Sequence, residues 1–136
     1  MRKFLLWIAA LLFLSLSEIC RAQDVVKVAP YHNKILMEND DVRVIENTLA
    51  PGDKDAMHTH PSGWYYVTKP GTMKIVFADG KVQTWEAKEG EGDWLQTKAP
   101  HTSENVGKTT LVYVLVEVKS AGKPRPATKP PRKAQQ

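Results

Sequence analysis

The middle of the chain is a succession of short apolar or β-branched runs separated by turn residues. Asp79-Gly80 lies between two of these runs, residues 72–78 and 81–87, and this dipeptide is typical of a tight β-hairpin turn. No part of residues 23–118 has the apolar spacing of an amphipathic helix. Many short runs with regular turns predict an all-β domain, built as a sandwich or a barrel. The other predicted strands are residues 25–28, 34–37, 42–49, 57–60, 64–68, 93–96 and 111–118.

Three of the four histidines form one pattern. His58 and His60 are separated by one residue, so on a strand they point to the same face. His101 follows from a distant segment and supplies a third imidazole. Neutral imidazoles are good ligands for transition metals, and three protein ligands leave a coordination position open. The pattern therefore predicts a metal site.

Both histidine segments resemble the two motifs of the cupin superfamily, and the resemblance extends over residues 34–118. In the first motif Trp64 stands where the family has a glutamate, and in the second Gln96 and Lys98 replace a proline and a glycine. The remaining motif positions fit the family at its own spacing: Gly52, His58, His60 and Gly71 in the first, and Gly90, His101 and Asn105 in the second.

This resemblance implies a double-stranded β-helix, the jelly-roll barrel of cupins. It also implies one divalent transition metal, namely Fe, Mn, Zn, Ni or Cu, bound by His58, His60 and His101. The family's fourth ligand is the missing glutamate, and Tyr65 is the other residue that the spacing allows at that position. Three neutral ligands leave the full charge of the ion uncompensated, which favours an anionic ligand from solution. The replacements left open for the fourth ligand are Glu46, Gln96 and His32.

An aromatic segment follows the first two histidines. Strand alternation puts Trp64 and Tyr66 on one face and Tyr65 on the other. Aligned with the motif, Trp64, Tyr66 and Gln96 are expected to line a pocket for a small molecule, and simple packing is the alternative for the aromatic residues. Trp85 is expected to serve packing, and Asn105 is expected to stabilise its turn.

The resemblance implies a metal-dependent enzyme, similar to dioxygenases or isomerases, that acts on a small organic molecule. Two alternatives stay open: a non-catalytic module that binds a metal or a small ligand, and a barrel without metal. The sequence does not decide whether the protein is an enzyme. Small cupins often pair, so a homodimer is a further expectation from the family.

The N-terminus has the layout of a secretory signal peptide. Arg2 and Lys3 precede an apolar run, residues 4–16, which is short for a membrane span. Cleavage is expected before Gln23, and an uncleaved anchor is the alternative. The only cysteine, Cys20, lies in the removed part. We therefore expect a secreted or periplasmic protein that has no disulfide and does not remain in the membrane after cleavage.

Charge is divided along the chain. Residues 23–118 hold 10 basic and 14 acidic side chains, whereas residues 119–136 hold 6 basic and no acidic ones. The basic balance of the whole chain therefore comes largely from the tail, and no motif indicates nucleic-acid binding. The prolines and lysines of residues 120–136 predict a disordered tail. The expected organisation is a signal peptide at 1–22, a barrel domain at 23–119 and this tail.

Overall fold

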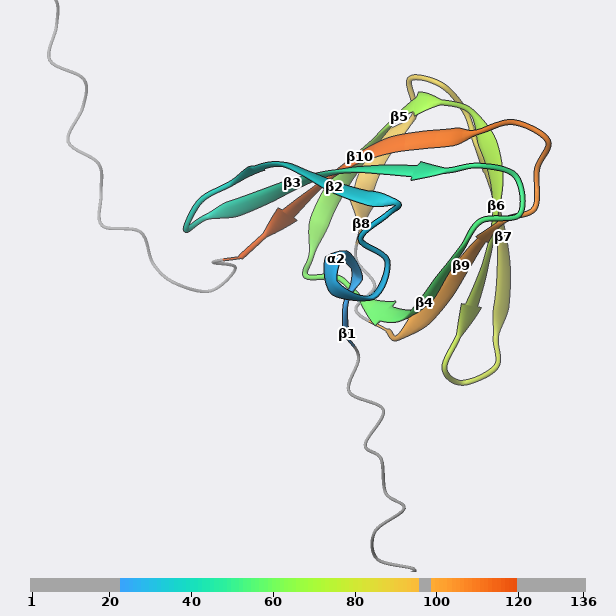
Figure 1. Cartoon of the computed structure of the whole chain (residues 1–136), viewed down its shortest axis with the longest axis horizontal. Coiled ribbons are helices and arrows are strands. Elements are labelled where there is room, and N and C mark those ends of the chain that lie inside the picture. The colour runs from blue at the N-terminus through green and yellow to red at the C-terminus, as the bar shows by residue number, and fades with distance from the viewer. Residues whose placement is uncertain (1–22, 96–98, 120–136) are drawn as a thin grey trace, which may run out of the picture.

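Two five-stranded β-sheets make up the fold in the computed structural model, which describes residues 23–95 and 99–119 (Figure 1). The strand order is β1-β4-β9-β6-β7 in one sheet and β2-β3-β10-β5-β8 in the other. The elements are β1 (Gln23–Asp24), α2 (Val25–Val28), β2 (Asn33–Glu38), β3 (Val42–Leu49), β4 (Lys54–Thr59), β5 (Gly63–Lys69), β6 (Gly71–Phe77), β7 (Val82–Ala87), β8 (Gly92–Leu95), β9 (His101–Asn105) and β10 (Leu111–Val118).

Most of the predicted strands are confirmed, two of them (β3 and β10) at the expected bounds. The hairpin at Asp79-Gly80 joins β6 to β7. Gly80 has a φ of +86°, a value that an L side chain rarely adopts, and the Phe77 N–H donates to the Lys81 carbonyl at 2.9 Å. The expectation of an all-β jelly roll is therefore met by two packed, mostly antiparallel sheets.

Two segments differ from the prediction. Val25–Val28 is one turn of helix and not a strand, because the Asp24 carboxylate accepts the Val26 N–H at 3.0 Å and caps it. His101–Asn105 is strand β9, although its polar sequence gave no strand signal. In β9 the alternate residues His101, Ser103 and Asn105 are buried. This strand lies between β4 and β6 and delivers the third histidine.

The core lies between the two sheets, and β10 is its central strand. Leu111, Tyr113 and Leu115 alternate along β10 and face inward, where Leu49 and Val67 are fully buried beside them. Burial of these side chains is the main favourable contribution to folding. No helix within residues 23–95 and 99–119 is long and apolar enough to cross a membrane.

The predicted signal peptide (1–22) and tail (120–136) lie outside the described residues.

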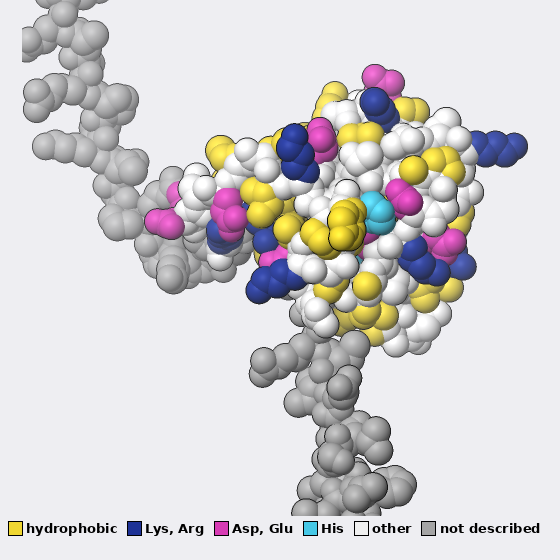
Figure 2. All heavy atoms as spheres, viewed as in Figure 1, with side chains coloured by type: hydrophobic (Ala, Val, Ile, Leu, Met, Phe, Trp, Pro, Cys, Tyr) yellow, Lys and Arg dark blue, Asp and Glu magenta, His cyan; other side chains and the backbone are white. Residues whose placement is uncertain are grey.

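On the face shown in Figure 2, basic and acidic side chains are interspersed. Elsewhere in the described residues opposite charges also pair, as Lys54 does with Glu104 at 3.2 Å. This face therefore carries no patch of a single charge.

Candidate metal centre

The fold brings the three predicted metal ligands together. His58 lies near the end of β4, His60 follows that strand, and His101 begins β9 directly opposite His58. All three are buried, and their candidate ligand atoms lie within 4.8 Å of one another. His58 and His101 are 43 positions apart in the sequence (101 − 58), and the pairing of β4 with β9 brings them together.

Each of the three imidazoles is held through its Nδ1 atom by a group that can only accept a hydrogen bond. The Ala56 carbonyl lies 2.7 Å from Nδ1 of His58, and the Ala99 carbonyl lies 2.9 Å from Nδ1 of His101. A carboxylate oxygen of Glu117 lies 3.0 Å from Nδ1 of His60. A neutral ring must then carry its proton on Nδ1 and its lone pair on Nε2.

The Nε2 lone pairs consequently converge. Nε2 of His58 and Nε2 of His60 are 3.1 Å apart, and two lone pairs at that distance repel each other. A cation between them removes the repulsion. Nitrogens bound at about 2.1 Å to one tetrahedral or octahedral ion are about 3.0 to 3.4 Å apart. The donor set therefore fits a divalent transition metal.

Burial keeps the imidazoles of His58 and His101 neutral. It lowers the pKa of His58 to about 4, with a further contribution from the nearby charge that His60 would carry. Burial also lowers the pKa of His101. Metal binding requires neutral imidazoles, so the site is prepared to accept a metal at neutral pH without first releasing protons from these two rings.

A pH dependence of stability follows for the metal-free protein. Below pH 6.5 the unfolded chain protonates His58 while the folded chain does not, so stability is full above 6.5 and falls as the pH drops toward about 4. The loss from His58 alone should reach about 3 kcal/mol. Urea unfolding of wild type and His58→Asn at several pH values measures it: the difference between them should change across this range. A difference independent of pH would contradict the prediction.

Three charged side chains, Glu117, Arg43 and Asp24, are linked in series to His60 by hydrogen bonds. Glu117 is 1% exposed, and its second oxygen accepts the Nε–H of Arg43 at 2.7 Å. The same guanidinium donates two hydrogen bonds to Asp24, at 2.7 and 3.0 Å. The carboxylate thus orients the ring of His60 and has its own charge compensated. Carboxylates that accept from metal-binding histidines have this role in metal proteins. Sequence reasoning missed Glu117, although it is the only charged residue in the apolar run of β10.

Of the proposed replacements for the family's glutamate, the structure places neither Glu46 nor His32 in the histidine cluster. Glu46 lies beside Val114 on the outer face of its sheet. His32 is held by Asp55, with 2.7 Å between Nδ1 and a carboxylate oxygen. Gln96 lies outside the described residues. Among those residues, the only metal-binding group of three or more side chains is the three histidines.

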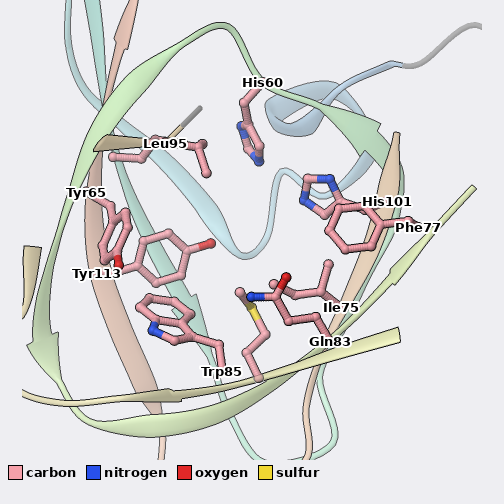
Figure 3. Close-up of a pocket in the computed structure, with 11 residues that line it drawn as sticks. His60, Tyr65, Ile75, Phe77, Gln83, Trp85, Leu95, His101 and Tyr113 are labelled. Carbon is pink, nitrogen blue, oxygen red and sulfur yellow. The ribbon is translucent and has the colours of Figure 1, made fainter. Parts of the chain in front are cut away.

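A cavity of about 170 Å³ opens beside the histidines (Figure 3). His60 and His101 form part of its wall. Apart from them, the lining is mostly apolar and aromatic: Tyr65, Met73, Ile75, Phe77, Gln83, Trp85, Leu95, Tyr113 and Leu115. Met73, Ile75 and Phe77 share one face of β6, as their alternation indicates.

The prediction that Trp64 and Tyr66 line the pocket is wrong. Trp64 and Tyr66 pair with Val116 and Val114 on the outer face of the sheet, where both are 40% exposed and stack on each other. The reason is the pleat: Tyr65, between them, points inward and lines the cavity in their place. Trp85, expected to serve packing, lines the cavity too.

Two polar atoms hold the aromatic wall in place. The Tyr65 hydroxyl and the Trp85 Nε1–H both donate to the same oxygen of Glu91, at 3.3 and 3.1 Å. Trp85 also contacts Tyr65 and Tyr113 edge to face. These contacts give the cavity a preformed shape.

Asn105 of the second motif stabilises a turn, as expected. It is 1% exposed, and its amide donates to the carbonyls of Leu49 and Thr109 at 2.7 and 2.8 Å. It therefore fixes the position of the strand that carries His101.

A matched pair of substitutions in β5 tests whether residue 64 or residue 65 faces the candidate metal site. Trp64→Glu puts a carboxylate on the outer face, so the metal affinity should stay within about twofold of wild type. Tyr65→Glu puts it on the cavity side, where its charge offsets that of the ion, and the affinity should rise. Competition with a chelator dye measures both. A large gain with Trp64→Glu would contradict the placement of Trp64 on the outer face.

The strands match those of several solved structures. A cupin domain from Bordetella pertussis Tohama I is similar at a TM-score of 0.60 and 21% identity, over 65% of this chain and 92% of that one. An RmlC-like cupin family protein from Methanocaldococcus jannaschii matches at 0.53 and 16%, over 63% and 77%. A conserved protein with a double-stranded β-helix domain from Klebsiella pneumoniae matches at 0.52 and 22%, over 75% and 93%.

The sequence matches no protein-family model and no curated protein. Agreement with these solved structures shows that the chain has the cupin fold, a double-stranded β-helix. Within this fold, the cluster of three histidines is a candidate metal-binding site.

Proposed function

We propose that this cupin binds a divalent transition metal through Nε2 of His58, His60 and His101, and that it is a metal-dependent enzyme acting on a small organic molecule. The observation that carries the proposal is the set of three buried imidazoles, each fixed through Nδ1, with Nε2 atoms that converge beside a cavity. Three protein ligands leave coordination positions for a substrate, as catalytic metal sites require.

The residues of the chain have separate roles in this proposal. A bound metal would supply Lewis acidity or, with a redox-active ion, oxygen chemistry. His60 and His101 border the cavity, so a molecule in the cavity lies against the metal side of the site. The aromatic wall excludes water and contacts the flat faces of the molecule. The metal identity and the reaction type, dioxygenase-like or isomerase-like, are for experiment to decide.

A non-catalytic module that binds a metal or a small ligand is the second candidate. The described residues that line the cavity include no carboxylate and no lysine, so apart from His60 and His101, which the metal would occupy, no side chain there is a ready general base. A reaction in this cavity would depend on the metal and its bound water for proton transfer. A cavity lined by acidic and basic side chains would favour catalysis, whereas this mostly apolar lining favours binding without turnover.

Metal analysis of the purified protein tests the proposal first. We expect about one equivalent of a transition metal per chain, restored by reloading after chelation. Oxygen uptake and product formation with a panel of small phenols and organic acids then separate the two candidates. Stoichiometric metal without any turnover would favour the binding module. Failure to take up Fe, Mn, Zn, Ni or Cu would refute the metal site, and with it the enzyme, and would leave only a module that binds a small ligand.

Export is part of the proposal, and it rests on the order of charged, apolar and small residues in 1–22. Protein recovered from its native host should begin at or near Gln23. Mass spectrometry of the intact chain measures this, and soluble cytoplasmic protein that keeps Met1 would contradict it. Formation of a homodimer likewise stays a prediction, which light scattering of the purified protein tests.

A further inference from the structure

The hydroxyl of Tyr113 points into the cavity and has no protein partner among the described residues. Tyr113 lies in the middle of β10, is 9% exposed and forms part of the cavity wall (Figure 3). By contrast, the polar atoms of its neighbours Tyr65 and Trp85 both donate to Glu91. A hydroxyl that faces a cavity and has no protein partner is normally hydrogen-bonded by a ligand or by water.

Tyr113 acts as a donor in this position. Burial raises the pKa of its hydroxyl, and the charge of Asp55 raises it further, so the proton is retained at any physiological pH. The amide of Gln83 also points into the cavity and lies on the exposed strand β7. Apart from the two histidines, the other described lining residues present mainly apolar or aromatic surface to the cavity.

The size and walls of the cavity restrict what it can hold. A cavity of about 150 Å³ with apolar walls accommodates benzene, so about 170 Å³ suits one six-membered ring with one or two small substituents. Phe77, Trp85 and Tyr65 present aromatic surface, which favours a flat ring. At the histidine end, a divalent ion with three neutral ligands favours an anionic oxygen group.

We propose, on the basis of the proposed metal site, that the cavity binds a monocyclic aromatic acid that carries a second oxygen on its ring, and that Tyr113 recognises this oxygen by donating a hydrogen bond. The acid group faces the metal, the ring lies between the aromatic walls, and the second oxygen accepts from Tyr113. Tyr113 is thus the residue that distinguishes oxygenated rings from plain ones.

Calorimetric titration of the metal-loaded protein tests this with three probes: benzoate, 3- or 4-hydroxybenzoate, and cyclohexanecarboxylate. Wild type should bind a hydroxybenzoate about 3- to 10-fold more tightly than benzoate, the effect of one net hydrogen bond. It should bind benzoate more tightly than the saturated acid. Tyr113→Phe should bind both aromatic acids equally, with unchanged metal content and thermal midpoint.

Tyr65→Phe is the matched control, because it removes a hydroxyl from the same wall that is directed to Glu91 and not to a ligand. It should keep the preference for hydroxybenzoate. A preference that persists in Tyr113→Phe, or that is lost equally in both variants, overturns the role of Tyr113. Metal-loaded wild type that binds none of the three acids overturns the ligand class while the metal site stands. Failure to load metal overturns the proposed function itself, and this inference with it.

Discussion

Replacing His58, His60 or His101 with alanine is expected to lower the affinity for a divalent metal by on the order of 100-fold or more for each variant, since even groups behind the ligands commonly change affinity by 10- to 100-fold. Each substitution removes one of three nitrogens that converge within 4.8 Å. Metal content after dialysis against a weak chelator gives the measurement.

His32→Ala is the control for this prediction. Its ring is partly exposed and pairs with Asp55, outside the three-histidine cluster, so its removal should leave the metal content unchanged. Thermal unfolding of all four variants without metal separates loss of a ligand from loss of the fold. Equal metal content in all four folded variants would refute the assignment of the three ligands.

The clustering of His58, His60 and His101 could be predicted from the sequence because their spacing matches a known motif. The strand that carries His101 could not, because β9 is polar and its strand character comes from pairing with β4 and β6 on both sides. Local preference is weak evidence for a strand that lies between two others. The single turn at Val25–Val28 depends on one capping side chain, that of Asp24, which a pattern of apolar residues does not detect.

Which face of β5 lines the cavity depends on an alignment that is uncertain by one residue. A shift by one position exchanges the two faces of a strand, and the motif allowed both Trp64 and Tyr65 at the glutamate position. Pairing with β10 decides between them, because Tyr65 lies opposite the inward Leu115 and Trp64 opposite Val116. Two other parts of the site depend on long-range pairing in the same way: the contact of Glu117 with Arg43, and the place of Tyr113 in the cavity.

Glu117 is the residue outside the three ligands whose replacement should have the largest effect. Among the described residues, Glu117→Leu leaves the partly buried guanidinium of Arg43 with only Asp24 as a partner. Removing one member of a fully buried ion pair costs about 3 to 5 kcal/mol, so the loss of stability here should be up to that size. The substitution also removes the acceptor that fixes Nδ1 of His60, so the metal affinity should fall by about 10- to 100-fold. Denaturant unfolding and chelator competition measure the two effects.

A second substitution separates these two roles. Arg43→Met added to Glu117→Leu removes both charges, and replacing a buried ion pair by apolar side chains is often neutral, so much of the stability should return. The metal affinity should stay low, because His60 still lacks its acceptor. Asp24→Asn, at the partly exposed end of the same chain of charges, should cost less than about 1 kcal/mol and leave the affinity unchanged. If the double variant regains both stability and metal affinity, Glu117 serves only to balance Arg43, and the orientation of His60 must come from elsewhere in the barrel.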